Sequence, residues 1–132
     1  MITRTNPPEL APAPPGYSHV VEVGGGRLIH IAGQVALDRE GNLVGKGDFV
    51  AQADQVFRNL GLALAAAGCT VQDLVKITVF LRDMTEIRAF IAARNRFLGT
   101  LTPSAAPAMT LVEVSGLFRD DVAIEVEAVA AL

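Results

Sequence analysis

The segment that decides the fold class is Ile124-Glu125-Val126-Glu127-Ala128-Val129-Ala130, close to the end of the chain. Side chains alternate between the two faces of a β-strand. One face of this segment is therefore apolar throughout its even-numbered positions, whereas Glu125 and Glu127 share the opposite face. An apolar face must be covered by a packed layer, while a polar face can meet water or a partner. The segment predicts a strand in a sheet that the chain itself covers on one side.

Two amphipathic segments can supply that covering layer. Asp48 is a suitable N-cap for a first helix, which Gly68 is placed to end. A second helix is predicted over residues 85–98, and the β-branched run of residues 75–81 between the helices predicts a strand. The apolar positions of the first helix recur at helical spacing and comprise Phe49, Ala53, Val56, Phe57, Leu60, Ala63 and Leu64. Helices separated by strands in this way must pack on a sheet.

The remaining strands are predicted on either side of this helical region. We expect strands over residues 17–23 and 27–32 joined by a turn at Gly24-Gly25-Gly26, a short third strand over 35–37, and closing strands over 108–114 and 122–131. The order is βββαβαββ, an α/β (α+β) fold with a mixed sheet and two helices on one face. Residues 1–16 are expected to form an extended arm, and residues 17–132 a single domain.

Composition narrows the class of protein. The 132 residues are 51% hydrophobic but only 5% aromatic, and the net charge is −3, which argues against a nucleic-acid partner. The chain has one cysteine, Cys69, and no apolar run of the roughly 18 residues that a membrane helix needs. Without a signal-peptide pattern, a cytoplasmic protein with no membrane association is expected. Cys69 and the two histidines lack the spacing of a metal site, so no metal is expected.

Three segments together resemble the RidA family (YjgF-type reactive intermediate imine/enamine deaminases, also labelled endoribonuclease L-PSP). They are Gly33-Gln34 after a strand, the run of residues 75–81, and the ending of residues 124–130. The resemblance implies a chorismate-mutase-like fold and a homotrimer around a central barrel. It also implies inter-subunit clefts that bind small molecules. Family members with the full site hydrolyse 2-imino acids to 2-keto acids and ammonia, with no cofactor and no metal.

The resemblance also assigns site residues, and here the sequence departs from the family. It implies that Glu125 is the catalytic acid/base. The substrate-binding positions that it implies are Tyr17, Ala32, Gly33, Met109 and Leu111. Three of these are altered, since Ala32 stands in place of Ser, Met109 in place of the carboxylate-binding Arg, and Leu111 in place of a frequent Cys.

The missing arginine is the main departure. Removing one partner of a buried charge pair costs about 2–5 kcal/mol, and residues 101–117 contain no Arg or Lys that could replace it. Arg94 on the second predicted helix is the candidate substitute, although a solvated helix face is the favoured interpretation. His30 shares a strand face with Ala32 and could supply a donor or base, although a packed or hydrogen-bonded role is favoured.

Three functions follow in order of preference. The first is a RidA-like hydrolase of imine or enamine intermediates, with altered activity and a preference for neutral or bulkier substrates because of Met109. The second is a non-catalytic trimer that binds a small molecule or a protein. The third, an endoribonuclease, is disfavoured by the acidic charge and the scarcity of aromatic residues.

Overall fold

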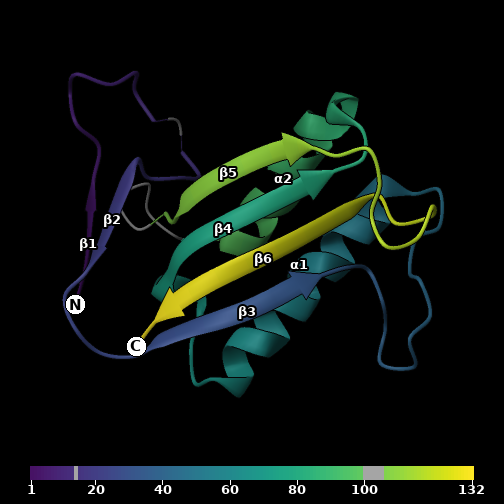
Figure 1. Ribbon diagram of the computed structural model, residues 1–132, viewed down its shortest axis with the longest axis horizontal. Helices are drawn as coiled ribbons and strands as arrows, with labels where there is room; N and C mark the ends of the chain where they lie inside the picture. Colours follow the sequence, from purple (N-terminus) through teal and green to yellow (C-terminus); the bar gives the residue numbers. More distant parts are fainter. Residues whose placement is uncertain (14, 100–105) are drawn as a thin grey trace.

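The computed structural model describes every residue except 14 and 100–105 (Figure 1). Its elements are β1 (Ile2–Thr5), β2 (Val20–Val23), β3 (Leu28–Gln34), α1 (Phe49–Ala66), the 3₁₀ turn η1 (Val71–Asp73), β4 (Leu74–Leu81), the 3₁₀ turn η2 (Met84–Glu86), α2 (Ile87–Leu98), β5 (Ala108–Glu113) and β6 (Ile124–Ala131). The order of strands and main helices again reads βββαβαββ, but β1 lies in the segment expected as an arm and no strand forms over residues 35–37, so the first three strands are not the three predicted ones.

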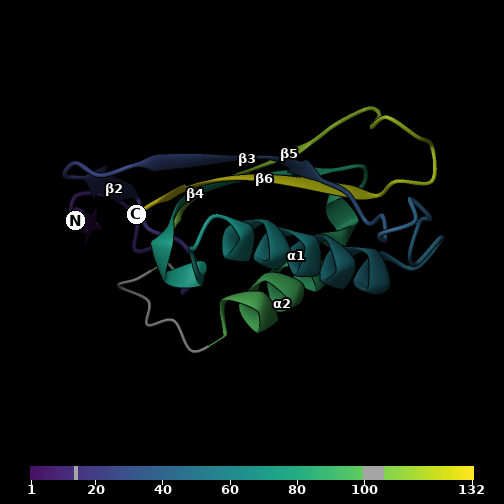
Figure 2. The ribbon, with the colours of Figure 1, turned by 90° about the horizontal axis from the view of Figure 1, so that it is seen from below.

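The main sheet has four strands in the order β3-β6-β4-β5. The β4–β5 pair is parallel, and β6 runs antiparallel to both β3 and β4, so the sheet is mixed as predicted. Both helices lie on one face of this sheet and leave the other face uncovered, as Figure 2 shows. We call the uncovered side the open face.

The alternation in β6 is confirmed by its burial. Ile124, Val126, Ala128 and Ala130 are all buried in the core under the helices. Glu125 and Glu127 lie on the open face, where the antiparallel register sets them opposite Phe80 and Thr78 of β4. The apolar half of β6 therefore anchors the helix layer, and the polar half is left available for a site.

The first helix begins and ends where the sequence predicts. The Asp48 side chain accepts a hydrogen bond from the Ala51 amide, and Gly68 adopts a positive φ of 76° just beyond the helix end. The second helix begins two residues later than expected, at Ile87, because Met84–Glu86 forms a 3₁₀ turn capped by Asp83.

The first part of the chain differs from the prediction. Residues 24–26 do not join two paired strands: β2 pairs with β1 in a separate two-stranded sheet, and β3 pairs with β6. The strand expected from residue 17 begins only at Val20, because Ser18 bonds through its amide to Pro107 O and through its hydroxyl to Ala106 O. Within residues 1–16, expected as an extended arm, Ile2–Thr5 forms β1.

The short strand predicted over residues 35–37 is also wrong. The carbonyl groups of Val35 and Leu37 accept hydrogen bonds from the side-chain amide of Asn59 on α1. Leu37 forms one isolated bridge, with Leu43. Because a helix side chain satisfies the backbone groups that a neighbouring strand would need, the segment stays irregular.

Candidate functional site

A bulge in β3 shapes the open face beside Glu125. Ile31 and Gln34 pair with Ala128 and Val126, so two residues of β3 lie between pairs that are only two residues apart on β6. Since Ala128 and Val126 both face the helices, Ala32 and Gly33 both lie on the open-face side of the strand. The predicted Gly-Gln motif therefore lies at the bulge of β3.

The Glu125 carboxylate lies directly against this bulge. A Cβ atom added to Gly33 would overlap Oε2 of Glu125 and crowd its Cδ. Only glycine leaves room for the carboxylate at this place, which explains the residue in physical terms. The structure thus brings together three of the predicted site residues, namely Ala32, Gly33 and Glu125, in what we call the carboxylate cluster.

Glu125 is half-buried and has no cationic partner within the part of the chain that the structure describes. Phe80 lies beside it on β4 by register, and Val112 follows on β5. A carboxylate that has apolar neighbours and no ion pair can accept a proton from a water molecule, or it can hold that water molecule in position. His30 lies on the same face and is exposed in the single chain, so it is not packed there; a hydrogen-bonded role for it remains a prediction.

A second cluster forms where α2, β5 and the segment before β2 meet. Arg94 on α2 is only 4% exposed, so the favoured interpretation of a solvated side chain is wrong. Its guanidinium Nη1 lies 3.5 Å from Met109 Sδ, and Nη2 donates to the carbonyl of Pro15 at 3.2 Å. Gly16 leaves the space for it, because a Cβ there would overlap the guanidinium. We call Gly16, Tyr17, Arg94 and Met109 the arginine cluster.

The electrostatics of this cluster are unusual. Among the described residues no carboxylate pairs with Arg94, whose remaining bonds go to the Asn95 side-chain oxygen. Burial lowers the pKa of the Arg94 guanidinium, and the nearby Tyr17 acts in the opposite direction. A guanidinium stays protonated at neutral pH, so the cluster holds a buried positive charge. Sequence reasoning proposed this arginine but could not tell that its helix face is buried.

The two clusters do not meet within one chain. Met109 and Leu111 pair with Ile77 and Val79 on the helix side of the sheet and pack against the core. Glu125 lies on the open face, and β4 separates β5 from β6. Leu111 is therefore a core-packing side chain in the single chain, and its predicted role in substrate binding remains a prediction.

A pocket of 930 Å³ borders the carboxylate cluster. Gly33 and Gln34 form part of its lining, and Arg39 and Arg58 line it together with Asp38 and Glu40, so the charges of the lining balance. Glu125 is not part of this lining.

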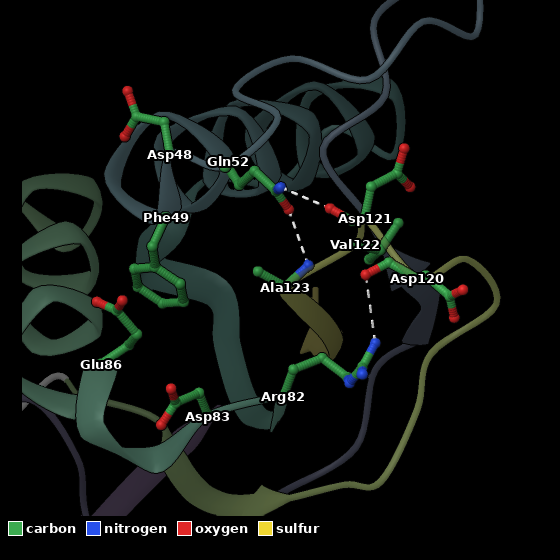
Figure 3. A pocket seen from close by; sticks show the side chains of 11 residues that line it. Asp48, Phe49, Gln52, Arg82, Asp83, Glu86, Asp120, Asp121, Val122 and Ala123 are labelled. Atoms are coloured by element: carbon green, nitrogen blue, oxygen red, sulfur yellow. Dashed lines mark hydrogen bonds between the residues drawn. The ribbon is translucent and has the colours of Figure 1, made fainter.

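Another pocket, of 420 Å³, lies at the start of α1 and holds none of the predicted site residues (Figure 3). Its rim carries the carboxylates of Asp48, Asp83, Glu86, Asp120 and Asp121. The buried Gln52 ties the pocket wall together, since its amide donates to Asp121 O at 2.8 Å and accepts from the Ala123 amide at 2.9 Å. No three His, Cys, Asp or Glu side chains are grouped for a metal ion within the described residues.

Within the described residues, no helix has the length and apolar character that crossing a bilayer requires.

Comparisons with known proteins give the chain its family. The family model described as Endoribonuclease L-PSP matches residues 8–132. A RutC family protein of Synechocystis is 40% identical over 124 residues, covering 92% of this chain and 91% of its own. A mouse protein named 2-iminobutanoate/2-iminopropanoate deaminase is 38% identical over 121 residues, covering 91% of this chain and 84% of its own.

Solved structures agree with this result. The crystal structure of YyfB from Yersinia pestis, described as a protein of unknown function of the conserved Rid family, superposes with a TM-score of 0.91. It is 35% identical, and the match covers 99% of this chain and 98% of that one. RidA from an Antarctic Psychrobacter is 32% identical with a TM-score of 0.71, covering 92% and 94%. The chain therefore belongs to the Rid (YjgF) family, with the chorismate-mutase-like fold of that family.

Proposed function

We propose that this protein binds and hydrolyses small imine or enamine metabolites in clefts between its subunits, with Glu125 as the acid/base. The observation that carries the proposal is the Glu125 carboxylate, which is seated over the Gly33 bulge and has no cationic partner among the described residues. The mouse relative that is named as an imine deaminase supports the reaction class.

Glu125 and a water molecule are sufficient for the proposed hydrolysis. Glu125 accepts a proton from water as the water oxygen bonds to the imine carbon, and the C=N electron pair moves to nitrogen. The nitrogen receives this proton back from Glu125 and a second one from the hydroxyl group of the water adduct, the C–N bond breaks, and the carbonyl forms as ammonia leaves. One imine and one water become one keto compound and one ammonia. Phe80, opposite Glu125 on β4, gives the carboxylate one apolar neighbour.

The proposed assembly is a homotrimer, because one chain leaves the arginine cluster and the carboxylate cluster apart. A second copy that covers the open face can bring its own residues beside Glu125. Self-association also removes the exposed apolar side chains Leu28 and Val112 from water. We expect light scattering at micromolar concentration to give the mass of three 13.9 kDa chains. A monomer under these conditions would contradict the proposed cleft.

The test of the reaction is Glu125→Gln, which keeps the size of the side chain and removes its basicity. We expect ammonia release from freshly generated 2-iminobutanoate to fall about 10²- to 10⁴-fold, the range of general acid–base contributions. Glu127→Gln is the matched control, since Glu127 lies on the same strand and face but is exposed. Equal activity of Glu125→Gln and the wild type on a substrate that the wild type turns over would rule out this mechanism.

A non-catalytic binding role is the second candidate. It is favoured by the packing of Met109 and Leu111 against the core, which leaves fewer polar groups to orient a reacting substrate. On this alternative the wild type binds a metabolite without releasing ammonia, and Glu125→Gln changes affinity only.

A further inference from the structure

Two side-chain amides of α1, those of Gln52 and Asn59, hold the main chain of the two strands that form the carboxylate cluster. Gln52 is only 1% exposed, and its Oε1 accepts a hydrogen bond from the Ala123 amide at 2.9 Å (Figure 3). Asn59 is half-buried, and its Nδ2 donates to the carbonyls of Val35 and Leu37 at 3.0 and 2.9 Å. These bonds go to backbone groups, so they determine where the main chain lies.

The bonded backbone groups lie at matching distances along the chain from the cluster. Ala123 precedes Glu125 by two residues, and Val35 follows Gly33 by two residues. Since β3 and β6 are antiparallel neighbours, these positions lie at the same end of the strand pair. One helix therefore holds β6 just before its carboxylate and β3 just after its bulge.

The two amides are themselves fixed in orientation. Gln52 Nε2 donates to the carbonyls of Gly45 and Asp121 at 3.2 and 2.8 Å. Asn59 Oδ1 accepts from Gln55 Nε2 at 2.9 Å, so the NH₂ group of Asn59 is the end that faces the β3 side. Gln52 and Asn59 are seven positions apart, which places them on one side of the helix about 10 Å apart along its axis.

The burial of Gln52 calls for an explanation other than stability. Gln52 lies in the same buried helix face as Ala53 and Val56. Burying an amide has a desolvation cost that its hydrogen bonds only offset. A hydrogen bond depends on both distance and angle, whereas an apolar contact does not have a direction. A fully bonded buried amide therefore specifies one arrangement of the segments around it.

We propose that Gln52 and Asn59 are positioning residues for Glu125. They hold β6 and β3 at the separation that seats the carboxylate over the bulge. The fit is close, since one carbon atom added to Gly33 would overlap the carboxylate. A shift of about 1 Å in the place of a reacting group can cost about 10²-fold in rate. The inference rests on the proposed function, because it extends the role of Glu125 to the helix residues that hold it.

Gln52→Met tests the proposal, because it nearly keeps the size of the side chain and removes its hydrogen bonds. We expect kcat for ammonia release from 2-iminobutanoate to fall about 10²-fold, with little change in KM because the substrate contacts remain. Leu64→Val is the matched control. Leu64 is buried in the last turn of the same helix, and its side chain loses packing but no hydrogen bond. It should leave the kcat of the folded protein unchanged.

A second measurement does not depend on turnover. The ¹³C resonance of the Glu125 carboxyl group, identified by its absence in Glu125→Gln, reports the surroundings of the carboxylate. We expect this resonance to shift in Gln52→Met and to keep its position in Leu64→Val. Asn59→Leu removes the bonds to Val35 and Leu37 and should shift the same resonance, so the test stays decisive if Gln52→Met does not fold.

Each result decides the inference. An unchanged Glu125 resonance in folded Gln52→Met or Asn59→Leu overturns it, and so does wild-type kcat in folded Gln52→Met. An equal fall of kcat in Leu64→Val would assign the loss to stability and would also overturn it. Absence of ammonia release by the wild type contradicts the proposed function instead, and the resonance alone then decides whether the two amides position Glu125.

Discussion

Met109→Arg destabilises the protein instead of restoring a carboxylate site. The new guanidinium would start from a half-buried position whose present side chain touches Nη1 of Arg94 at 3.5 Å. Two positive charges about 4 Å apart repel each other by about 4 kcal/mol at an effective dielectric constant of 20. We expect a loss of up to this size in the free energy of unfolding, measured with urea.

Moving the positive charge from residue 94 to residue 109, instead of adding a second one, should avoid this loss of stability. The double variant Arg94→Met/Met109→Arg keeps one guanidinium in the cluster, so its stability should return to near that of the wild type. Met109→Gln is the control that separates charge from polarity and should cost much less than Met109→Arg. If Met109→Arg alone is as stable as the wild type, the two side chains do not share one space, and the description of the arginine cluster is wrong.

Gly33→Ala has the second large effect, and it falls mainly on activity. The added Cβ would overlap the Glu125 carboxylate, so the carboxylate must leave its place over the bulge. We expect ammonia release to fall at least about 10²-fold, with little change in the free energy of unfolding, because the atoms that must move are the end of the flexible Glu125 side chain. The backbone of Gly33 does not have a positive φ, so strain is not the cause.

Two comparisons isolate that cause. Gly116→Ala is the matched control, since nothing lies within 4 Å of its added Cβ and its φ is not positive. In a Glu125→Gln background, Gly33→Ala should cause little further loss of activity, because both changes disable the same group. Wild-type activity in Gly33→Ala would show that the position of Glu125 over the bulge does not matter for the reaction.

The elements that were predicted well are those whose pattern is local. The alternation in residues 124–130 determined which face of β6 is buried, and the spacing of apolar residues after Asp48 determined α1 and its core face. Both follow from the repeat of side-chain direction along one element, which does not depend on what lies opposite. The Gly33-Gln34 motif and Glu125 can also be singled out from the sequence, but their close approach in the structure cannot.

The strand predictions that were wrong share one physical cause, because the pairing of two strands depends on segments that are far apart in the sequence. The Gly24-Gly25-Gly26 turn permits a hairpin, but whether β2 pairs with β3 or β1 depends on which backbone partner is available in three dimensions. The pairing of β1, close to the start of the chain, leaves β3 to β6. Likewise, residues 35–37 have side chains that favour a strand, but Asn59 of α1 donates hydrogen bonds to the carbonyl groups of Val35 and Leu37.

The sequence by itself therefore determined the fold class and the covered face of the sheet, and it singled out Glu125 as the candidate acid/base. Only the tertiary structure decided the state of Arg94. Helical periodicity does not decide whether Arg94 is buried, because its turn of the helix contains both exposed and buried residues. A charged side chain on a helix is normally solvated. Its burial results from the approach of Pro15 and Gly16, nearly eighty positions earlier in the chain, and of Met109 on another strand. Contacts between such distant segments leave no periodic signal in the sequence, because each depends on how the whole chain packs.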